Sequence, residues 1–126
     1  LGRVASPRFA TENPGDREEV IHMATVVSVQ IPLGEPLSSE EARRLAEETA
    51  PKYKEAPGLV RKYFVRGEDG LTWGGIYLWE TRAQAEMLFD EAWHKRVSET
   101  YGSPPTMVWV DCPLVLDNRH GEVITD

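Results

Sequence analysis

Short runs rich in β-branched and aromatic residues alternate along this chain with turn residues and with stretches of helical spacing. Runs of this composition and length predict β-strands. The turn Gly67-Glu68-Asp69-Gly70 separates two of these runs, which predicts that they pair as an antiparallel hairpin. The predicted strands cover residues 24–31, 59–66, 73–79 and 106–111.

Two amphipathic helices are expected between these strands. Ser38 and Glu41 form a capping-box pattern at the start of the first helix. Pro51 is expected to kink or break this helix, because proline lacks the N–H donor and its ring clashes with the preceding turn. Thr81 and Gln84 begin the second helix, which runs to about residue 101. Its apolar stripe, at steps of three and four, is Ala85, Leu88, Phe89, Ala92, Trp93 and Val97.

The order β-α-β-β-α-β predicts an α+β, ferredoxin-like fold, with a four-stranded antiparallel sheet and two helices on one face. Two helices can cover only one face of such a sheet. The predicted strands nevertheless carry apolar or aromatic residues at most positions. A second copy of the same sheet would cover the other face, so we expect a homodimer.

The chain length fits one domain, preceded by a different segment. The chain has 126 residues. Residues 1–22 are polar and rich in turn formers, which is typical of an N-terminal arm or extension, so the compact domain is expected at 23–126. Residues 114–116 are expected to form a short apolar tail, and Asp117-Asn118 to begin a closing loop.

Charge and composition argue against several classes of function. The net charge of −7 opposes nucleic-acid binding. No apolar run approaches the roughly 18 residues of a membrane span, and the start lacks the apolar centre of a signal peptide, so a cytoplasmic protein without a membrane partner is expected. Cys112 is the single cysteine, and the three histidines lack metal-ligand spacing. The chain has no Gly-rich phosphate loop or G-x-S-x-G motif, so neither a metal nor another cofactor is expected.

Three blocks of sequence carry a family resemblance. They are PGLVRKYFV at 57–65, GGIYLWE at 74–80, and VDCPL at 110–114 followed by Asp117-Asn118. Together they resemble the YdhR-like mono-oxygenases of the dimeric α/β-barrel superfamily. The resemblance implies a homodimer with sheets packed face to face and a pocket between sheet and helices. It also implies a superfamily of cofactor-independent oxygenases, haem degraders, isomerases and members without known activity.

Alternation along the hairpin places the candidate site residues. In the third strand Trp73, Gly75, Tyr77 and Trp79 share one face, and in the second strand Leu59, Arg61, Tyr63 and Val65 share one face. The hairpin register decides whether these two sets meet. If they meet, Arg61 and Tyr77 lie together beside the gap left by Gly75, where a planar aromatic ligand would fit.

Oxidation without a cofactor needs a base, donors for the substrate anion and a dry cavity. Arg61 is the candidate to hold an enolate or phenolate, Tyr63 or Tyr77 to donate hydrogen bonds, and His94 to act as base. The catalytic candidates are therefore Arg61, Tyr77 and His94, and the substrate-binding candidates are Tyr63, Trp73, Gly75, Trp79 and Trp93.

Each candidate also has a purely structural interpretation. The tryptophans and tyrosines suit a core or dimer interface, Arg61 suits a rim salt bridge, and His94 follows Asp90 at the spacing of an exposed helical pair. The function predicted is a cofactor-independent mono-oxygenase acting on a small aromatic or polyketide-like substrate. Two alternatives remain open: a non-catalytic dimer that binds a small hydrophobic ligand, and a non-oxidative isomerase or cyclase.

Overall fold

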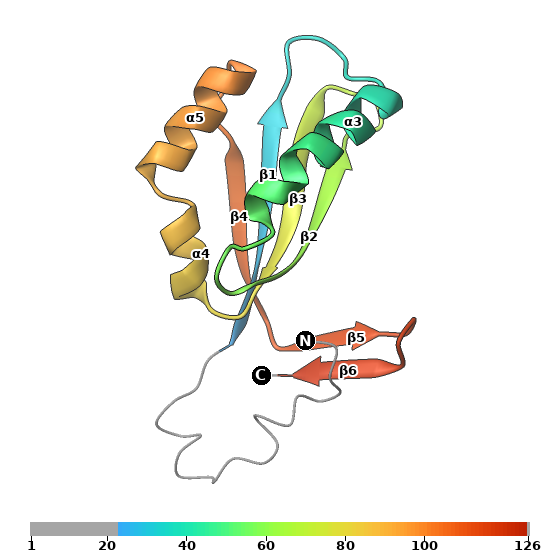
Figure 1. Ribbon diagram of the computed structural model, residues 1–126, viewed down its shortest axis with the longest axis vertical. Coiled ribbons are helices and arrows are strands. Elements are labelled where there is room, and N and C mark those ends of the chain that lie inside the picture. The colour runs from blue at the N-terminus through green and yellow to red at the C-terminus, as the bar shows by residue number, and fades with distance from the viewer. Residues whose placement is uncertain (1–22, 126) are drawn as a thin grey trace, which may run out of the picture.

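Four antiparallel strands and three α-helices form the body of the protein. The computed structural model describes residues 23–125, so the predicted arm at 1–22 lies outside the described residues. The sheet has the strand order β2-β3-β1-β4, from β1 (Ala24–Pro32), β2 (Leu59–Arg66), β3 (Thr72–Trp79) and β4 (Thr106–Cys112). Figure 1 shows α3 (Ser39–Thr49) in front of the sheet and α4 (Arg82–Leu88) with α5 (Glu91–Tyr101) alongside β4. The predicted ferredoxin-like α+β fold is confirmed.

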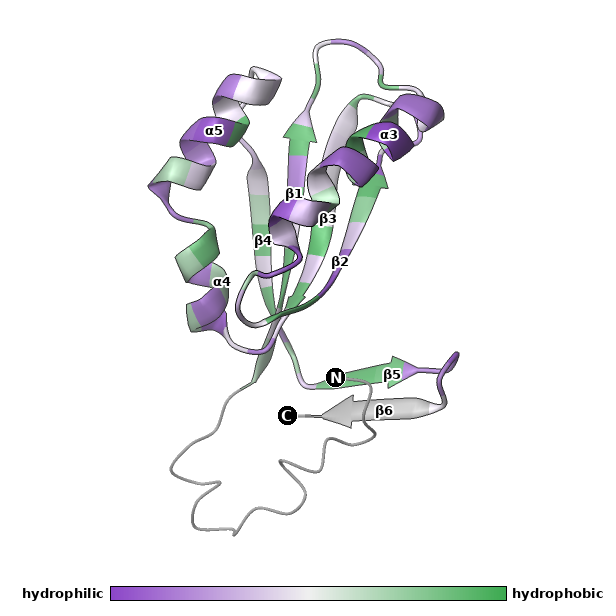
Figure 2. Ribbon diagram, viewed as in Figure 1, coloured by the Kyte–Doolittle hydropathy of each residue, from purple (hydrophilic) through white to green (hydrophobic). Residues whose placement is uncertain are grey.

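The first helix begins and ends where its sequence predicts. The Ser38 hydroxyl accepts a hydrogen bond from the Glu41 backbone N–H at 3.1 Å, and the Glu41 carboxylate accepts one from the Ser38 N–H at 3.0 Å. The expected break at Pro51 is present: α3 ends at Thr49 and continues as the 3₁₀-helix η1 (Ala50–Tyr53). Figure 2 shows that α3 is largely hydrophilic, which fits a helix that presents most of its surface to water.

The second predicted helix is two helices, which corrects the prediction of one continuous element. The backbone of Phe89 leaves the helical region, with φ −83° and ψ 53°. Asp90 then caps a new helix, its carboxylate accepting a hydrogen bond from the Trp93 N–H at 2.8 Å. Phe89 and Trp93 remain buried on both sides of the break, but Ala92 of the predicted stripe is exposed.

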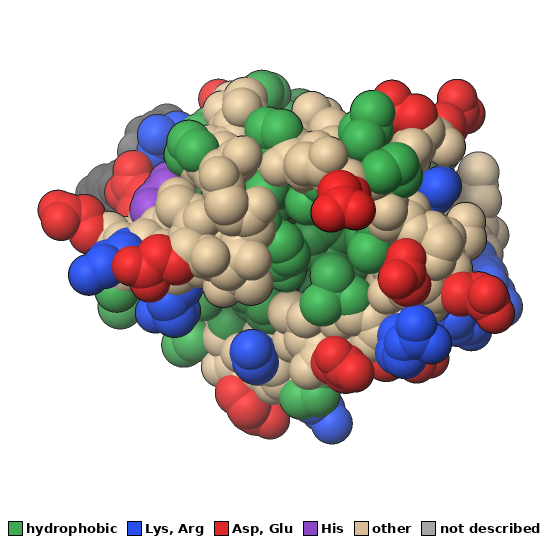
Figure 3. Space-filling model, turned by 90° about the horizontal axis from the view of Figure 1, so that it is seen from above, with side chains coloured by type: hydrophobic (Ala, Val, Ile, Leu, Met, Phe, Trp, Pro, Cys, Tyr) green, Lys and Arg blue, Asp and Glu red, His purple; other side chains and the backbone are tan. Residues whose placement is uncertain are grey.

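The core lies between the helices and one face of the sheet. The predicted shared face of β3 is confirmed, because Trp73, Tyr77 and Trp79 are all buried on the helix side. Gly74 points to the other face, where a Cβ would overlap the carbonyl oxygen of Val29 on β1. Figure 3 shows one end of the molecule, with hydrophobic side chains gathered in the middle and charged side chains around them.

Beyond β4 the chain forms a hairpin in place of the predicted apolar tail and loop. β5 (Leu114–Asp117) pairs with β6 (Glu122–Thr125) apart from the main sheet (Figure 1). Asp117 supports the turn, because its carboxylate accepts a hydrogen bond from the His120 N–H at 3.2 Å. No helix within residues 23–125 is long and apolar enough to cross a membrane.

Candidate functional site

The register of the β2–β3 hairpin decides which side chains reach the helix side of the sheet. Leu59 lies opposite Trp79, but Arg61 lies opposite Leu78, so β2 carries one extra residue at this point. Beyond this irregularity Lys62 lies opposite Tyr77 and Phe64 opposite Gly75. Because directly opposed residues share a face, Lys62 points to the helices and Arg61 to the other side of the sheet. The sequence analysis allowed Arg61 to lie beside Tyr77 in one register of the hairpin. In the structure Arg61 does not lie beside Tyr77.

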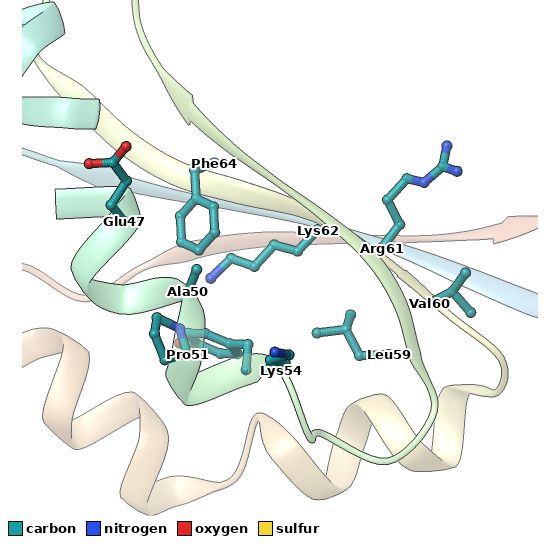
Figure 4. A pocket seen from close by; sticks show the side chains of 10 residues that line it. Glu47, Ala50, Pro51, Lys54, Leu59, Val60, Arg61, Lys62 and Phe64 are labelled. Carbon is teal, nitrogen blue, oxygen red and sulfur yellow. The ribbon is translucent and has the colours of Figure 1, made fainter. Parts of the chain in front are cut away.

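Lys62 extends into a cavity of about 510 Å³ between β2 and the segment formed by α3 and η1. Figure 4 shows the Lys62 side chain running toward Phe64 and Ala50, while the Arg61 side chain leaves β2 in the opposite direction. The size lies within the range of small-molecule sites. The cavity is lined by Glu47, Ala50, Pro51, Tyr53, Lys54, Leu59, Val60, Arg61, Lys62 and Phe64.

Aromatic rings surround the amine of Lys62. Its Nζ lies 3.5 Å from the centroid of the Tyr53 ring, 4.0 Å from that of Phe64 and 4.5 Å from that of Tyr77. Ring faces attract an ammonium ion through their quadrupole. Among the ion pairs of the described residues, none involves Lys62. The lysine therefore lies among apolar groups with no carboxylate to hold its charge.

This environment changes the protonation of Lys62. Burial lowers its pKa from 10.5 to about 7, because the charged form loses its hydration. The ring faces favour the ammonium and oppose this effect. An amine with this pKa exists in both forms near neutral pH, so it can take up a proton and release it again.

One of the rings around the Lys62 amine is held by a hydrogen bond from the core. The Tyr53 hydroxyl accepts a hydrogen bond from Trp93 Nε1 at 3.1 Å, which connects η1 to α5. The rings of Tyr53 and Tyr77 meet edge to face at 5.9 Å. Burial, followed by the nearby Tyr53 hydroxyl, raises the pKa of Tyr77 above its ordinary value. Tyr77 therefore stays a neutral phenol and lines the site as a ring and a hydrogen-bonding group.

The three tryptophans predicted at the site are all buried in the core. Trp73 is buried and stacks against Phe64, with 6.2 Å between the ring centroids. Trp79 is fully buried in the core, and Trp93 supports Tyr53. The predicted gap at Gly75 is present and is used by Lys62: a Cβ there would lie 2.9 Å from Lys62 Cε.

Arg61 and Tyr63 form a separate group on the opposite face of the sheet. Arg61 Nη1 donates a hydrogen bond to the Tyr63 hydroxyl at 3.2 Å, and Arg61 Nη2 pairs with Asp117 at 3.4 Å. The hydrogen bond to Tyr63 is the main cause of a raised pKa of Arg61. Asp117 also accepts a hydrogen bond from His120 Nδ1 at 3.0 Å. This bond is the largest cause of the lowered pKa of Asp117, which is about 2. Arg61 thus joins β2 to the β5–β6 hairpin.

His94 lies on α5 and is not among the residues that line the Lys62 cavity. Its ring packs edge to face on Trp93, with 5.0 Å between the ring centroids. The suggested pair of Asp90 with His94 is not among the ion pairs found within residues 23–125, and the Asp90 carboxylate instead caps the Trp93 N–H. The site residues that the sequence analysis missed are Lys62, Tyr53 and Lys54. A lysine in the middle of a strand of apolar and aromatic residues was the available signal.

Comparison with known proteins extends the description of the fold. No family model matches this chain, and no curated protein is significantly similar to it. A structural match is the crystal structure of a monooxygenase from the gene ActVA-Orf6 of Streptomyces coelicolor in complex with the ligand Nanaomycin D. The TM-score is 0.55 at 18% sequence identity, over 71% of this chain and 88% of that chain. This chain therefore shares the ferredoxin-like fold of that monooxygenase.

Proposed function

We propose that this protein is a cofactor-independent mono-oxygenase that acts on a small aromatic or polyketide-like substrate in the Lys62 cavity. The observation that carries the proposal is a half-buried amine with a pKa of about 7 that lies against aromatic ring faces and takes part in none of the ion pairs found within residues 23–125. The fold shared with a monooxygenase supports it. Lys62 is proposed to act both as the base, a role that the sequence analysis assigned to His94, and as the cation beside the substrate anion, a role that it assigned to Arg61.

The proposed reaction begins with removal of an acidic proton from a CH₂ group next to an aromatic ring or carbonyl. The neutral amine of Lys62 takes this proton, and the resulting ammonium lies beside the substrate anion and stabilises it. The anion gives one electron to O₂, and the two radicals combine to form a C–O bond. The peroxide accepts the proton from Lys62, and the hydroperoxide then loses water to leave a ketone. The balance is CH₂ + O₂ → C=O + H₂O.

The surroundings of Lys62 suit this chemistry. Leu59, Ala50 and Pro51 supply apolar walls, and apolar walls favour a flat hydrophobic substrate. Gly75 leaves room for the lysine chain, so the amine reaches the rings of Tyr53 and Phe64. A bound flat substrate would displace water from these walls, which would strengthen the interaction between the ammonium and the substrate anion.

We expect the purified protein to consume oxygen with anthrone, without added flavin or metal. The reason is that Lys62 supplies the base, and the anthrone anion itself reduces oxygen. An oxygen electrode with product analysis measures one O₂ consumed for each ketone formed. Uptake that requires flavin would contradict the proposal. Exchange of the substrate proton with solvent without uptake would support an isomerase or cyclase, and binding without either would support a ligand-binding protein.

We further propose that two copies associate through the face of the sheet that the helices leave uncovered. Val108 and Val110 of β4 are 54% and 50% exposed, and Ile76 of β3 is 38% exposed. Because β4, β1, β3 and β2 lie side by side, these side chains belong to one surface. An exposed apolar face of this kind is a typical interface between identical subunits.

Light scattering at micromolar concentration is expected to give twice the chain mass of 14.2 kDa. Val108→Asp should shift the protein toward the monomer, because a symmetric interface would bury the new carboxylate twice. Met87→Asp is the matched control, since Met87 is 76% exposed on α4, away from this face. A wild-type protein with the mass of one chain would exclude the proposed dimer.

A further inference from the structure

The charged side chains around the Lys62 cavity are not balanced. Four of them line it: Glu47, Lys54, Arg61 and Lys62. Glu47 forms an ion pair with Arg43, with 3.6 Å between Oε2 and Nε, and Arg61 forms one with Asp117. Lys54 and Lys62 take part in none of the ion pairs found within residues 23–125. The cavity therefore holds two unpaired amines, in a chain whose net charge is −7.

Lys54 stands at the mouth of the cavity. It follows η1 directly, and its backbone N–H donates to the Pro51 carbonyl at 3.4 Å, which holds the end of the short helix. Its side chain is exposed, and Figure 4 places it between η1 and Leu59. Lys62 lies further in, against the rings of Tyr53 and Phe64. The Lys54 amine is therefore exposed to solvent at the entrance, and the Lys62 amine lies against aromatic rings further in.

From this arrangement we infer that the ligand of the cavity is an aromatic carboxylate, whose acidic group binds Lys54 at the mouth while its rings lie against Lys62 and the apolar walls. The inference deepens the proposed function, because it takes the Lys62 cavity as the substrate site. A neutral aromatic would fill the same walls but leave Lys54 without a partner. A carboxylate is a planar acceptor that an ammonium binds by a charge-assisted hydrogen bond.

The test is equilibrium binding of two isosteric probes, anthraquinone-2-carboxylate and anthraquinone-2-carboxamide. Both are already oxidised at the central ring, so binding is measured without turnover. At pH 7 and low salt, titration calorimetry should show the carboxylate bound about threefold to fivefold more tightly, in line with an ion pair to an exposed lysine. Lys54→Gln should remove this preference, and Lys54→Arg should retain it.

Lys52→Gln is the matched control, because Lys52 is an exposed lysine of η1 that does not line the cavity. Equal affinity of the wild type for both probes, or an equal loss in the Lys52 and Lys54 variants, would overturn the inference. Failure to bind either probe would also overturn it. Oxygen uptake with anthrone, which has no carboxylate, tests the proposed function separately. A carboxylate preference without oxygen uptake would leave this inference standing and remove the mono-oxygenase.

Discussion

Replacing Lys62 with methionine is expected to lower the rate of oxygen uptake by about a hundredfold or more, because the reaction loses its base. Methionine keeps the length and much of the volume of the lysine side chain, so the space beside the Tyr53 and Phe64 rings remains filled. Lys62→Arg is the more discriminating variant. Arginine keeps the positive charge but does not release its proton near neutral pH, so a base is lost while the charge stays. Lys52→Met, on the outer surface of η1, is the control.

The pH dependence of the wild type provides a second measurement. The base is active when neutral, so kcat/KM should rise as the pH increases through about 7 and level off above it. The folded-state pKa lies below the ordinary 10.5, so the unfolded chain binds more protons between about pH 7 and 10.5. The free energy of unfolding should therefore rise with pH across this window, and Lys62→Met should lose that rise. A Lys62→Arg variant with wild-type rate, or a flat pH profile, would show that Lys62 is not the base.

Trp93→Ala is expected to destabilise the protein by about 3–5 kcal/mol, because it opens a large cavity in the core. Trp93 is 3% exposed, and its ring meets that of Phe89 at 4.7 Å. Its Nε1 also donates to the Tyr53 hydroxyl, which the substitution leaves without this donor. Urea denaturation measures the change in the free energy of unfolding.

Two further variants separate the contributions at this position. Trp93→Phe keeps much of the ring volume but removes the donor, so it should cost about 1–2 kcal/mol. Met87→Ala, at a position 76% exposed on α4, should stay within about 0.5 kcal/mol of the wild type. Leu88 is only half-buried, so Leu88→Ala should cost less than Trp93→Ala. A denaturation midpoint that does not move in Trp93→Ala would contradict the observed packing of α5.

The elements that depend on local interactions could be predicted from the sequence. The capping box at Ser38 and Glu41 operates within one turn of helix, and the break at Pro51 needs only the proline ring. Strand β2 was predicted with its bounds, and the set of β3 residues that share one face follows from strict alternation. The split between α4 and α5 was missed, although Asp90 is a residue suited to an N-cap, because the apolar stripe continues through it.

The site itself depended on pairing between strands. With regular pairing from Leu59 and Trp79, Arg61 would lie opposite Tyr77, as the sequence analysis allowed. One extra residue in β2 shifts the register, so that Lys62 takes this position and Arg61 turns to the other face. Alternation along a single strand fixes which residues share a face, but not which face meets the helices. That choice is made by the hydrogen bonds between β2 and β3, which form only in the folded chain, and it placed the lysine in the cavity.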